Sequence, residues 1–533
     1  MTSKKYEYEP LRSKEIRLLH LSKADNGEPT FRLYRETLDD NLKYEAISYT
    51  WGSSVRGNVI YHADTGQGAF VTANCERVLR SLLATGNNRI WIDGLCINQD
   101  DVTERSQQVR LMGRIFRNAN RTIAYIGEHD EHSRAVIAWA DSPTSHWSTI
   151  LEDKVSFKDH LHALQLLSRP FFRRTWVIQE VLLSTNLAIT IGLEELNFDM
   201  LSMWDFKIFS TQRSPAKGVL TLKTEFSRGD NMQSYKKWAQ SIMHQPKRLP
   251  QMNRLWKTPA SALNLITATN LLNPGYLFDL LCATAAYDCT DPRDKIFALV
   301  SLFERGLPEA LQPNYSCSVE ELYTNVSAFL LTYGVARVLS AATYDEKGGL
   351  PSWAVDWRCK LHEDAFDRSV GAFAASSSAG FDSFRETNIR VCDKRAIKVR
   401  GLRLTQVSTC PRDVGQAAVH KDLTDMRELD ADELLRWDRA LSGARPPDQY
   451  LQYGSADGTT ALVPKETQRG DWICVLLGFT VPFVLRPCPA DEWKLVGECY
   501  VQNYMKGEAV QSVEKHHVHD PELIDPLVDF VLI

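Results

Sequence analysis

The stretch from residue 44 to residue 183 alternates strand-like and helix-like patterns, and this alternation most limits what the chain can fold into. Residues 44–52 (YEAISYTWG) predict a buried strand that ends at a tight turn, where Gly52 lets the backbone bend. Residues 89–92 predict a second strand and residues 122–127 a third, and apolar residues recur at helical spacing between them. This order is typical of a parallel sheet with crossover helices, so we expect a flavodoxin-like α/β core.

A further segment places an acidic side chain beside this sheet. Residues 169–183 (RPFFRRTWVIQEVLL) predict a helix that carries Trp176, Glu180 and Leu183 on one face. In a flavodoxin-like fold, ligands bind outside the carboxyl ends of the strands. Glu180 is therefore the candidate catalytic residue. The residues expected to bind a substrate beside it are Tyr49, Trp51, Asp93, Cys96, Asn98, Gln99 and Trp176.

Three ordered blocks in this stretch resemble a known family. They are YEAISYTWG at residues 44–52, WIDGLCINQDD at residues 91–101 with the Glu104 that follows, and FRRTWVIQEV at residues 172–181. Their order and spacing are similar to those of the fungal heterokaryon-incompatibility (HET) domain. A weaker likeness continues in residues 289–299, 311–323 and 470–508, so the chain is identified as a full-length fungal HET-domain protein.

The third block is also similar to an element of TIR domains, the Trp-x-x-x-Glu sequence found here from Trp176 to Glu180. Residues 44–52 likewise resemble the first TIR strand and its following loop. The resemblance implies a TIR-like fold, whose glutamate is catalytic in the members that cleave NAD. Glu180 would then contact the ribose hydroxyls and stabilise the oxocarbenium-like centre as nicotinamide leaves. NAD would be the substrate, Tyr49 and Trp51 would stack on a ring of it, and no cofactor or metal would be needed.

Each candidate side chain also has a purely structural interpretation. Tyr49 and Trp51 could pack at the end of a strand, as aromatic residues often do. Asp93 could pair with Arg173 or Arg174 as a structural ion pair. The remaining alternatives are a capping-box acid for Glu104 after Asp101, a small core residue for Cys96, and a shifted site register caused by the insertion at residues 128–168.

At 533 residues the chain is too long for one ordinary core, so several domains are expected. We predict a HET domain at residues 1–195 with its core at 44–183, a helical middle region at 196–345, and a mainly β accessory domain at 346–533. Smaller expected features are a hairpin around residues 25–27, a helix capped by Asn74, helix starts at Asp291 and Ser318, a mobile loop at 213–251, alternation at 353–357, a helix at 430–441 and a hairpin at 472–485.

Composition narrows the classes of function. With 44% hydrophobic and 24% charged residues the chain is globular, and its net charge of -5 gives no case for nucleic-acid binding. The sequence shows no secretion signal and no apolar run long enough to span a membrane. The 11 cysteines form no CxxC pair, as expected for reduced thiols in the cytoplasm. We interpret the histidines at 516, 517 and 519 as surface residues rather than a metal site.

Two functions from different classes remain open. The HET resemblance implies heterokaryon incompatibility, in which non-self recognition triggers programmed cell death. In the first hypothesis the HET domain cleaves NAD; in the second it is a non-enzymatic signalling or assembly module that acts with a protein partner from an incompatibility locus or as a homo-oligomer. An enzyme predicts that Glu180 lines a concave pocket with Tyr49 or Trp51, whereas a scaffold predicts an exposed Glu180 or one held in a salt bridge.

Overall fold

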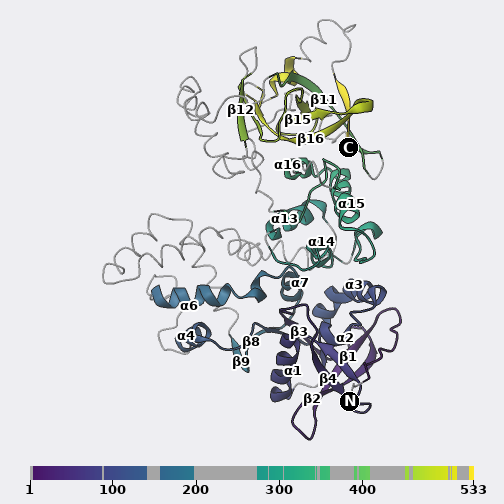
Figure 1. Ribbon diagram of the computed structural model, residues 1–533, viewed down its shortest axis with the longest axis vertical. Helices are drawn as coiled ribbons and strands as arrows, with labels where there is room; N and C mark the ends of the chain where they lie inside the picture. The colour runs from purple at the N-terminus through teal and green to yellow at the C-terminus, as the bar shows by residue number, and fades with distance from the viewer. Residues whose placement is uncertain are drawn as a thin grey trace. The chain divides into compact units, whose positions relative to one another are not determined.

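The protein folds into two compact units, which Figure 1 shows in a computed structural model. The first unit comprises residues 1–272 and 286–316, and the second comprises residues 273–285 and 317–533. The chain therefore enters the second unit, returns to the first, and leaves it again. The three predicted domain ranges stay a prediction. The structure describes residues 4–86, 89–140, 157–196, 273–285, 287–303, 305–342, 344, 349–359, 389–392, 395–408, 450–454, 460–501, 504, 505, 507–512 and 527–533.

The first unit is an α/β domain built on a nine-stranded sheet in the order β5-β4-β2-β1-β6-β3-β7-β8-β9. The strands β6, β3, β7 and β8 pair in parallel, whereas β1 with β2, β4 with β5 and β8 with β9 pair antiparallel. The sheet is thus mixed: four parallel strands lie together from β6 to β8, and β2 also pairs in parallel with β4. The strands are β1 (Glu15–Lys23), β2 (Pro29–Thr37), β3 (Glu45–Tyr49), β4 (Asn58–His62), β5 (Gly68–Val71), β6 (Ile90–Trp91), β7 (Arg121–Tyr125), β8 (Leu187–Ile191) and β9 (Glu194–Leu196).

Local sequence signals explain the first elements of this unit. The predicted hairpin is confirmed: β1 and β2 pair in one continuous register around a turn in which Gly27 has φ 87. Helix α1 (Ala73–Thr85) follows β5, but Asn74 is not its cap. The cap is Thr72, whose side chain accepts a hydrogen bond from the Cys75 backbone amide. The side-chain amide of Asn74 instead donates to the Thr50 carbonyl.

Of the helices that follow β6 along the chain, α3 begins at a capping side chain. The short helix α2 (Asp93–Cys96) starts two residues after β6. Helix α3 (Val102–Asn118) begins at Asp101, whose carboxylate accepts from two amides of the first turn, as predicted. The chain then continues through α4 (Glu131–Ala140), α6 (Phe157–Leu167), the 3-10 turn η1 (Pro170–Arg173) and α7 (Val177–Leu182).

A later segment returns to complete the first unit. It carries α14 (Asp294–Val300) and the 3-10 turn η3 (Glu309–Leu311), and α14 packs on α7. The predicted helix start at Asp291 lies three residues too early, because Asp291 accepts from the Arg293 amide in a turn that precedes α14. Every residue from Ile296 to Val300 is buried, so this short helix is entirely a core element.

The described part of the second unit joins three helices to a β structure. The helices are α13 (Pro274–Thr284), α15 (Val319–Thr332) and α16 (Arg337–Ala341), and Ser318 caps α15 as predicted. Residues 353–357 form turns rather than a strand, although Trp353, Val355 and Trp357 are all buried. Their alternating pattern reflects burial alone.

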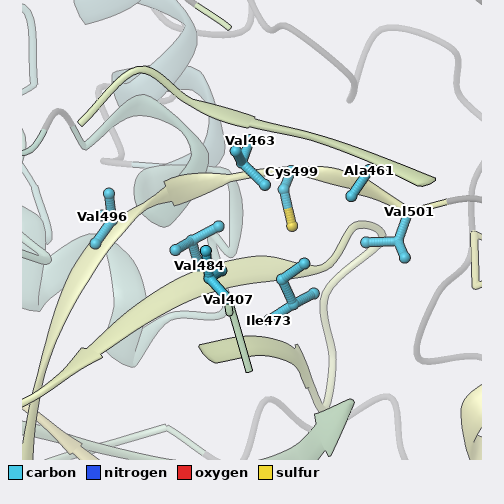
Figure 2. Close-up of a cluster of buried hydrophobic side chains, with 8 residues drawn as sticks. All are labelled: Val407, Ala461, Val463, Ile473, Val484, Val496, Cys499 and Val501. Carbon is cyan, nitrogen blue, oxygen red and sulfur yellow. The ribbon is translucent and has the colours of Figure 1, made fainter. Parts of the chain in front are cut away.

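The second unit ends in a barrel-like sheet. Strands β11, β14, β15, β16 and β18 pair in that order, and β18 pairs back with β11, so the ring closes. Figure 2 shows buried side chains at its core, among them Ile473, Val484 and Cys499. The predicted hairpin at residues 472–485 is confirmed by β14 and β15. The strands are β10 (Arg390–Val391), β11 (Ile397–Gln406), β12 (Tyr450–Gly454), β13 (Thr460–Pro464), β14 (Trp472–Leu476), β15 (Phe483–Pro487), β16 (Glu492–Glu498), β17 (Tyr500–Val501) and β18 (Val528–Leu532), with the 3-10 turn η7 (Pro489–Asp491).

Several expectations fall outside the described residues. They are the mobile loop at 213–251, the helix at 430–441 and the histidines at 516, 517 and 519. Of the predicted helical middle region, residues 197–272 lie outside as well, and its described remainder contains α13 to α16. Among the helices that the structure describes, none has the length and apolar character to cross a membrane.

Candidate functional site

The candidate site lies at the carboxyl ends of β3 and β6, beside α7. Successive residues of a strand point to opposite faces of the sheet, so Ser48 and Tyr49 at the end of β3 face different helices. The Ser48 hydroxyl donates to Glu180 on α7, whereas the Tyr49 ring lies beside Cys75 on α1. The end of one strand therefore contributes contacts to both α7 and α1.

Glu180 is held by two partners. Its Oε2 accepts from the Ser48 hydroxyl at 2.5 Å, and the Arg174 guanidinium donates to both carboxylate oxygens at 3.3 and 3.4 Å. Only 3% of Glu180 is exposed. We call Ser48, Arg174 and Glu180 the Glu180 cluster. In this arrangement both carboxylate oxygens are occupied, so the cluster is closed to a ligand of Glu180.

Asp93 lies next to the Glu180 cluster, at the start of α2. Its Oδ2 accepts from the Trp51 indole at 2.9 Å, while its enclosed Oδ1 has no hydrogen-bond partner among the described residues. Burial raises the pKa of Asp93 to about 6, against the lowering effect of the Arg174 charge, and the Glu180 charge raises it further. Asp93 and Glu180 are thus close enough to repel each other, with Arg174 between their charges.

Tyr49 is enclosed on the opposite face of the sheet. Its exposed fraction is 2%, and its hydroxyl forms no regular hydrogen bond within the described part of the chain. The backbone of Gly94 approaches so closely that a side-chain carbon there would lie 2.6 Å from the Tyr49 hydroxyl oxygen. Burial raises the pKa of Tyr49 well above its ordinary value. The structure therefore brings Trp51, Asp93 and Glu180 together, and the enclosed Tyr49 lies close enough to Asp93 and Arg174 for their charges to act on it.

The remaining predicted site residues support the loop after β6 or face away from Glu180. The Cys96 thiol accepts from the Ile92 amide, and burial raises its pKa to about 12. The backbone amide of Asn98 donates to the Glu104 carboxylate, and the Gln99 side chain donates to the Asp93 backbone carbonyl. The Trp176 indole hydrogen-bonds to Asp294 on α14.

Sequence reasoning missed two parts of this arrangement. Ser48 was not singled out, although a serine in the middle of an otherwise apolar and aromatic strand signals a buried partner. The capping-box role of Glu104 was wrong: its carboxylate accepts from the Asn98 backbone amide rather than from that of Asp101, and it forms an enclosed ion pair with Arg17 at 2.6 Å. The alternative in which Asp93 forms an ion pair with Arg173 or Arg174 was wrong, because Arg174 pairs with Glu180 and Arg173 with Asp288.

Two further observations limit the chemistry. No group of three or more His, Cys, Asp or Glu side chains in the described ranges could hold a metal ion. A hollow of about 210 Å³ in the first unit lies between α1 and the strands β7 and β8, lined by Val78, Leu82, Ile123 and Tyr125 rather than by Glu180. The Glu180 cluster could therefore act on a substrate only after Arg174 moves from Glu180.

Comparisons with known proteins agree with this description. The family model "Heterokaryon incompatibility protein (HET)" matches residues 44–180, and the model "Het-6 beta-barrel domain" matches residues 407–519. The chain is similar to "Heterokaryon incompatibility protein 6, OR allele" of Neurospora crassa, with 21% identity over 94% of this chain and 95% of that protein. No solved structure matches it.

Proposed function

We propose, on the premise that this chain is a fungal HET-domain protein, that it acts in heterokaryon incompatibility as a non-self-recognition protein whose activation triggers programmed cell death. The premise rests on two matches at separate parts of the chain. Similarity to an incompatibility protein along nearly the whole length supports the same function for both. It acts with a protein partner encoded at an incompatibility locus, or as a homo-oligomer once activated.

The chemical step that we propose is hydrolysis of the N-glycosidic bond of NAD. The central strand order β6-β3-β7-β8, numbered along the chain from β3, is 2-1-3-4, which supports a TIR-like, flavodoxin-type core. Such cores bind ligands at the carboxyl ends of their strands, where Asp93 and Glu180 lie. The single observation that carries the proposal is the convergence there of the buried Glu180 carboxylate and the half-buried Asp93, whose enclosed Oδ1 has no hydrogen-bond partner among the described residues.

Glu180 and Asp93 each have a role in this hydrolysis. As the bond from ribose C1′ to the nicotinamide nitrogen breaks, its electron pair neutralises the pyridinium nitrogen and the ribose gains positive charge. Glu180 stabilises that charge and binds the ribose hydroxyls. A water molecule then adds to C1′, and Asp93 accepts its proton and passes it to solvent. The products are nicotinamide and ADP-ribose.

This chemistry requires the Glu180 cluster to open, because Arg174 and Ser48 occupy the Glu180 oxygens. The test is incubation of the purified chain with NAD and measurement of nicotinamide by chromatography. We expect Arg174→Ala to release nicotinamide faster than the wild type, and the double variant Arg174→Ala/Glu180→Ala to release none. Glu131→Ala, at an exposed position of α4, is the control. Equal release with and without Glu180 would exclude the proposed chemistry.

A specific observation favours the non-enzymatic alternative. Glu180 is buried in a salt bridge, the arrangement that a scaffold predicts. In that case the cluster stabilises a signalling or assembly surface. Glu180→Gln keeps the shape of the side chain and an acceptor oxygen but removes the charge. Cell death that persists in cells expressing Glu180→Gln would support the assembly module. Loss of both cell death and nicotinamide release in this variant would support the enzyme.

A further inference from the structure

Residues 287–316 lie beyond the matched HET segment, yet they form hydrogen bonds to α3 and α7, the two helices that flank the site. On α3, the Ser106 hydroxyl accepts from the Tyr315 amide at 3.0 Å, and Arg110 donates to the Pro313 carbonyl at 2.9 Å. On α7, Gln179 accepts from the Ser301 hydroxyl. We call residues 287–316 the return segment. It joins α3 to α7 from outside the sheet.

The return segment also fixes the backbone around Arg174. The Asp288 amide donates to the Arg173 carbonyl at 2.6 Å, and the Thr175 amide donates to the Asp288 carbonyl at 2.9 Å. These two bonds hold the residues on either side of Arg174, whose side chain carries the ion pair with Glu180. The position of Arg174 therefore depends on a segment more than a hundred residues further along the chain.

Asp294 is the side chain at which these contacts meet. Its Oδ1 accepts from the Tyr315 hydroxyl at 2.7 Å, and it hydrogen-bonds to the Trp176 indole at the start of α7. The Tyr315 ring lies under the Arg105 guanidinium of α3, 4.1 Å from its centre. Asp294 is 9% exposed. One carboxyl group thus links α7, α3 and the return segment.

A buried carboxylate is an expensive way to make these contacts. The acceptor for Tyr315 could be an amide oxygen, which carries no charge to desolvate. Burial raises the pKa of Asp294 to about 6, so the group carries its charge near neutral pH despite that cost. A carboxyl group kept at such a cost, where the contacts of three elements meet, points to a function for Asp294.

We infer that Asp294 is a positioning residue for Glu180, because it joins Trp176 at the start of α7 to Tyr315, which is held on α3. The ionised carboxylate accepts from both neighbours and keeps α7, and with it the Glu180 cluster, in one position. The inference rests on the proposed function only in making Glu180 the catalytic residue. Asp294 itself touches no substrate.

Hydrogen exchange of peptides from residues 174–183 measures this positioning directly in the full chain. We expect Asp294→Ala to speed their exchange by about tenfold, because two hydrogen bonds that anchor α7 are lost, and Asp294→Asn to restore most of the protection. Tyr315→Phe, which removes only one donor hydroxyl, gives a smaller increase and replaces Asp294→Ala if that variant does not fold. Asp64→Asn, in an exposed pair with Arg32, is the control and leaves these peptides unchanged.

The pH dependence separates a carboxylate from a simple structural acceptor. The charged and titratable groups that face Asp294 are Tyr315, Asp291, Arg105 and Cys289. The pKa of Asp294 in the folded chain lies above the ordinary 3.8, so the packed state favours the neutral carboxyl group. As the pH falls from about 7.5 to 5, we therefore expect protection of residues 174–183, corrected for intrinsic exchange, to rise more in the wild type than in Asp294→Asn, which has no carboxyl group to protonate there.

The outcomes distinguish this inference from the proposed function. Unchanged exchange in both Asp294→Ala and Tyr315→Phe, or equal pH profiles for the wild type and Asp294→Asn, would overturn the positioning role whatever the activity. Faster exchange in Asp294→Ala, together with nicotinamide release that does not depend on Glu180, would support the positioning role and reject the chemistry. Faster exchange with a matching loss of Glu180-dependent release supports both.

Discussion

Arg17 and Glu104 form an ion pair that is almost fully enclosed, with 2% and 9% of the two side chains exposed. Two contacts of 2.6 and 2.9 Å join them. Removal of one partner leaves the other charge buried without compensation, which costs about 3–5 kcal/mol. We therefore expect Glu104→Ala to lower the unfolding free energy of the first unit by about 3 kcal/mol, measured by urea-dependent hydrogen exchange of peptides from β1 and β2.

The control is Glu36→Ala. Glu36 pairs with Arg89 at 2.8 Å, but 37% of its side chain is exposed. Exposed pairs contribute little, so the expected change is below about 0.5 kcal/mol. Similar losses for Glu36→Ala and Glu104→Ala would show that burial does not set the cost.

Asp93 gives the first unit a specific dependence on pH. Its folded-state pKa of about 6 lies above the ordinary value of 3.8, so the folded state favours the neutral carboxyl group. This contribution to stability is complete below about pH 4 and is lost as the pH rises through about 6. Asp93→Asn cannot ionise, and we expect it to exceed the wild type by about 2–3 kcal/mol at pH 7 and to match it near pH 4, in urea titrations at each pH. A pH-independent difference would contradict this account.

At this scale the sequence predicts residues better than it predicts their partners. Trp51, Asp93 and Glu180 follow from block motifs and strand ends, and the structure brings them together. The Ser48 contact could not be predicted, because 132 residues separate Ser48 from Glu180 and no local pattern joins them. The substrate-binding role of Tyr49 stays a prediction, although strand alternation puts its side chain on the face opposite Ser48.

The contact between α3 and α14 depends on a glycine. A methyl group at Gly113 in α3 would overlap the Ser301 carbonyl oxygen just after α14 and lie 3.3 Å from Leu183. In an open helix Gly→Ala stabilises by about 1 kcal/mol, but overpacking costs about 1–3 kcal/mol. We expect Gly113→Ala to destabilise the first unit by about 2 kcal/mol net, measured by urea unfolding with hydrogen exchange of α3 peptides.

Gly57→Ala tests whether the room around the glycine, rather than the change from glycine to alanine itself, decides the change in stability. At Gly57 only the Val55 side chain lies within reach of an added carbon, at 3.8 Å. The expected change is within about 0.5 kcal/mol of zero, of either sign. A stabilising Gly113→Ala would mean that α14 moves away from α3 at little cost.

Elements were predictable where their signals are local. The hairpin β1–β2, the strand β7 and the caps of α3 and α15 follow from turn residues, alternation and capping boxes within a few positions. The antiparallel pairing of β1 with β6 was not predicted, because pairing between strands that are distant along the chain leaves no mark on either strand alone. A local pattern can also mislead. Alternating apolar residues at 353–357 predict a strand, but the chain forms turns there in which Trp353, Val355 and Trp357 are buried.

The whole molecule is organised by a chain that leaves its first unit and returns. The matched HET segment ends at residue 180, whereas the contacts of that unit extend through residue 316. Sequence patterns assign residues 287–316 to a region between two domains, because α14 looks like any short apolar helix. Only tertiary contacts assign the return segment to the first unit, where it packs on α3 and α7.

This organisation predicts which fragments of the first unit fold cooperatively. The return segment buries Ile296, Phe297 and Leu299 completely, so a fragment of residues 1–196 would expose the apolar surface that they cover. We expect that fragment to bind a hydrophobic dye and to unfold without a cooperative transition, in calorimetry. Joining residues 287–316 to it through a flexible linker restores cooperative unfolding, and the same joined fragment with Ile296→Asp does not. If residues 1–196 alone unfold as cooperatively as the joined fragment, the return segment is dispensable, and Asp294 then loses its structural route to Glu180.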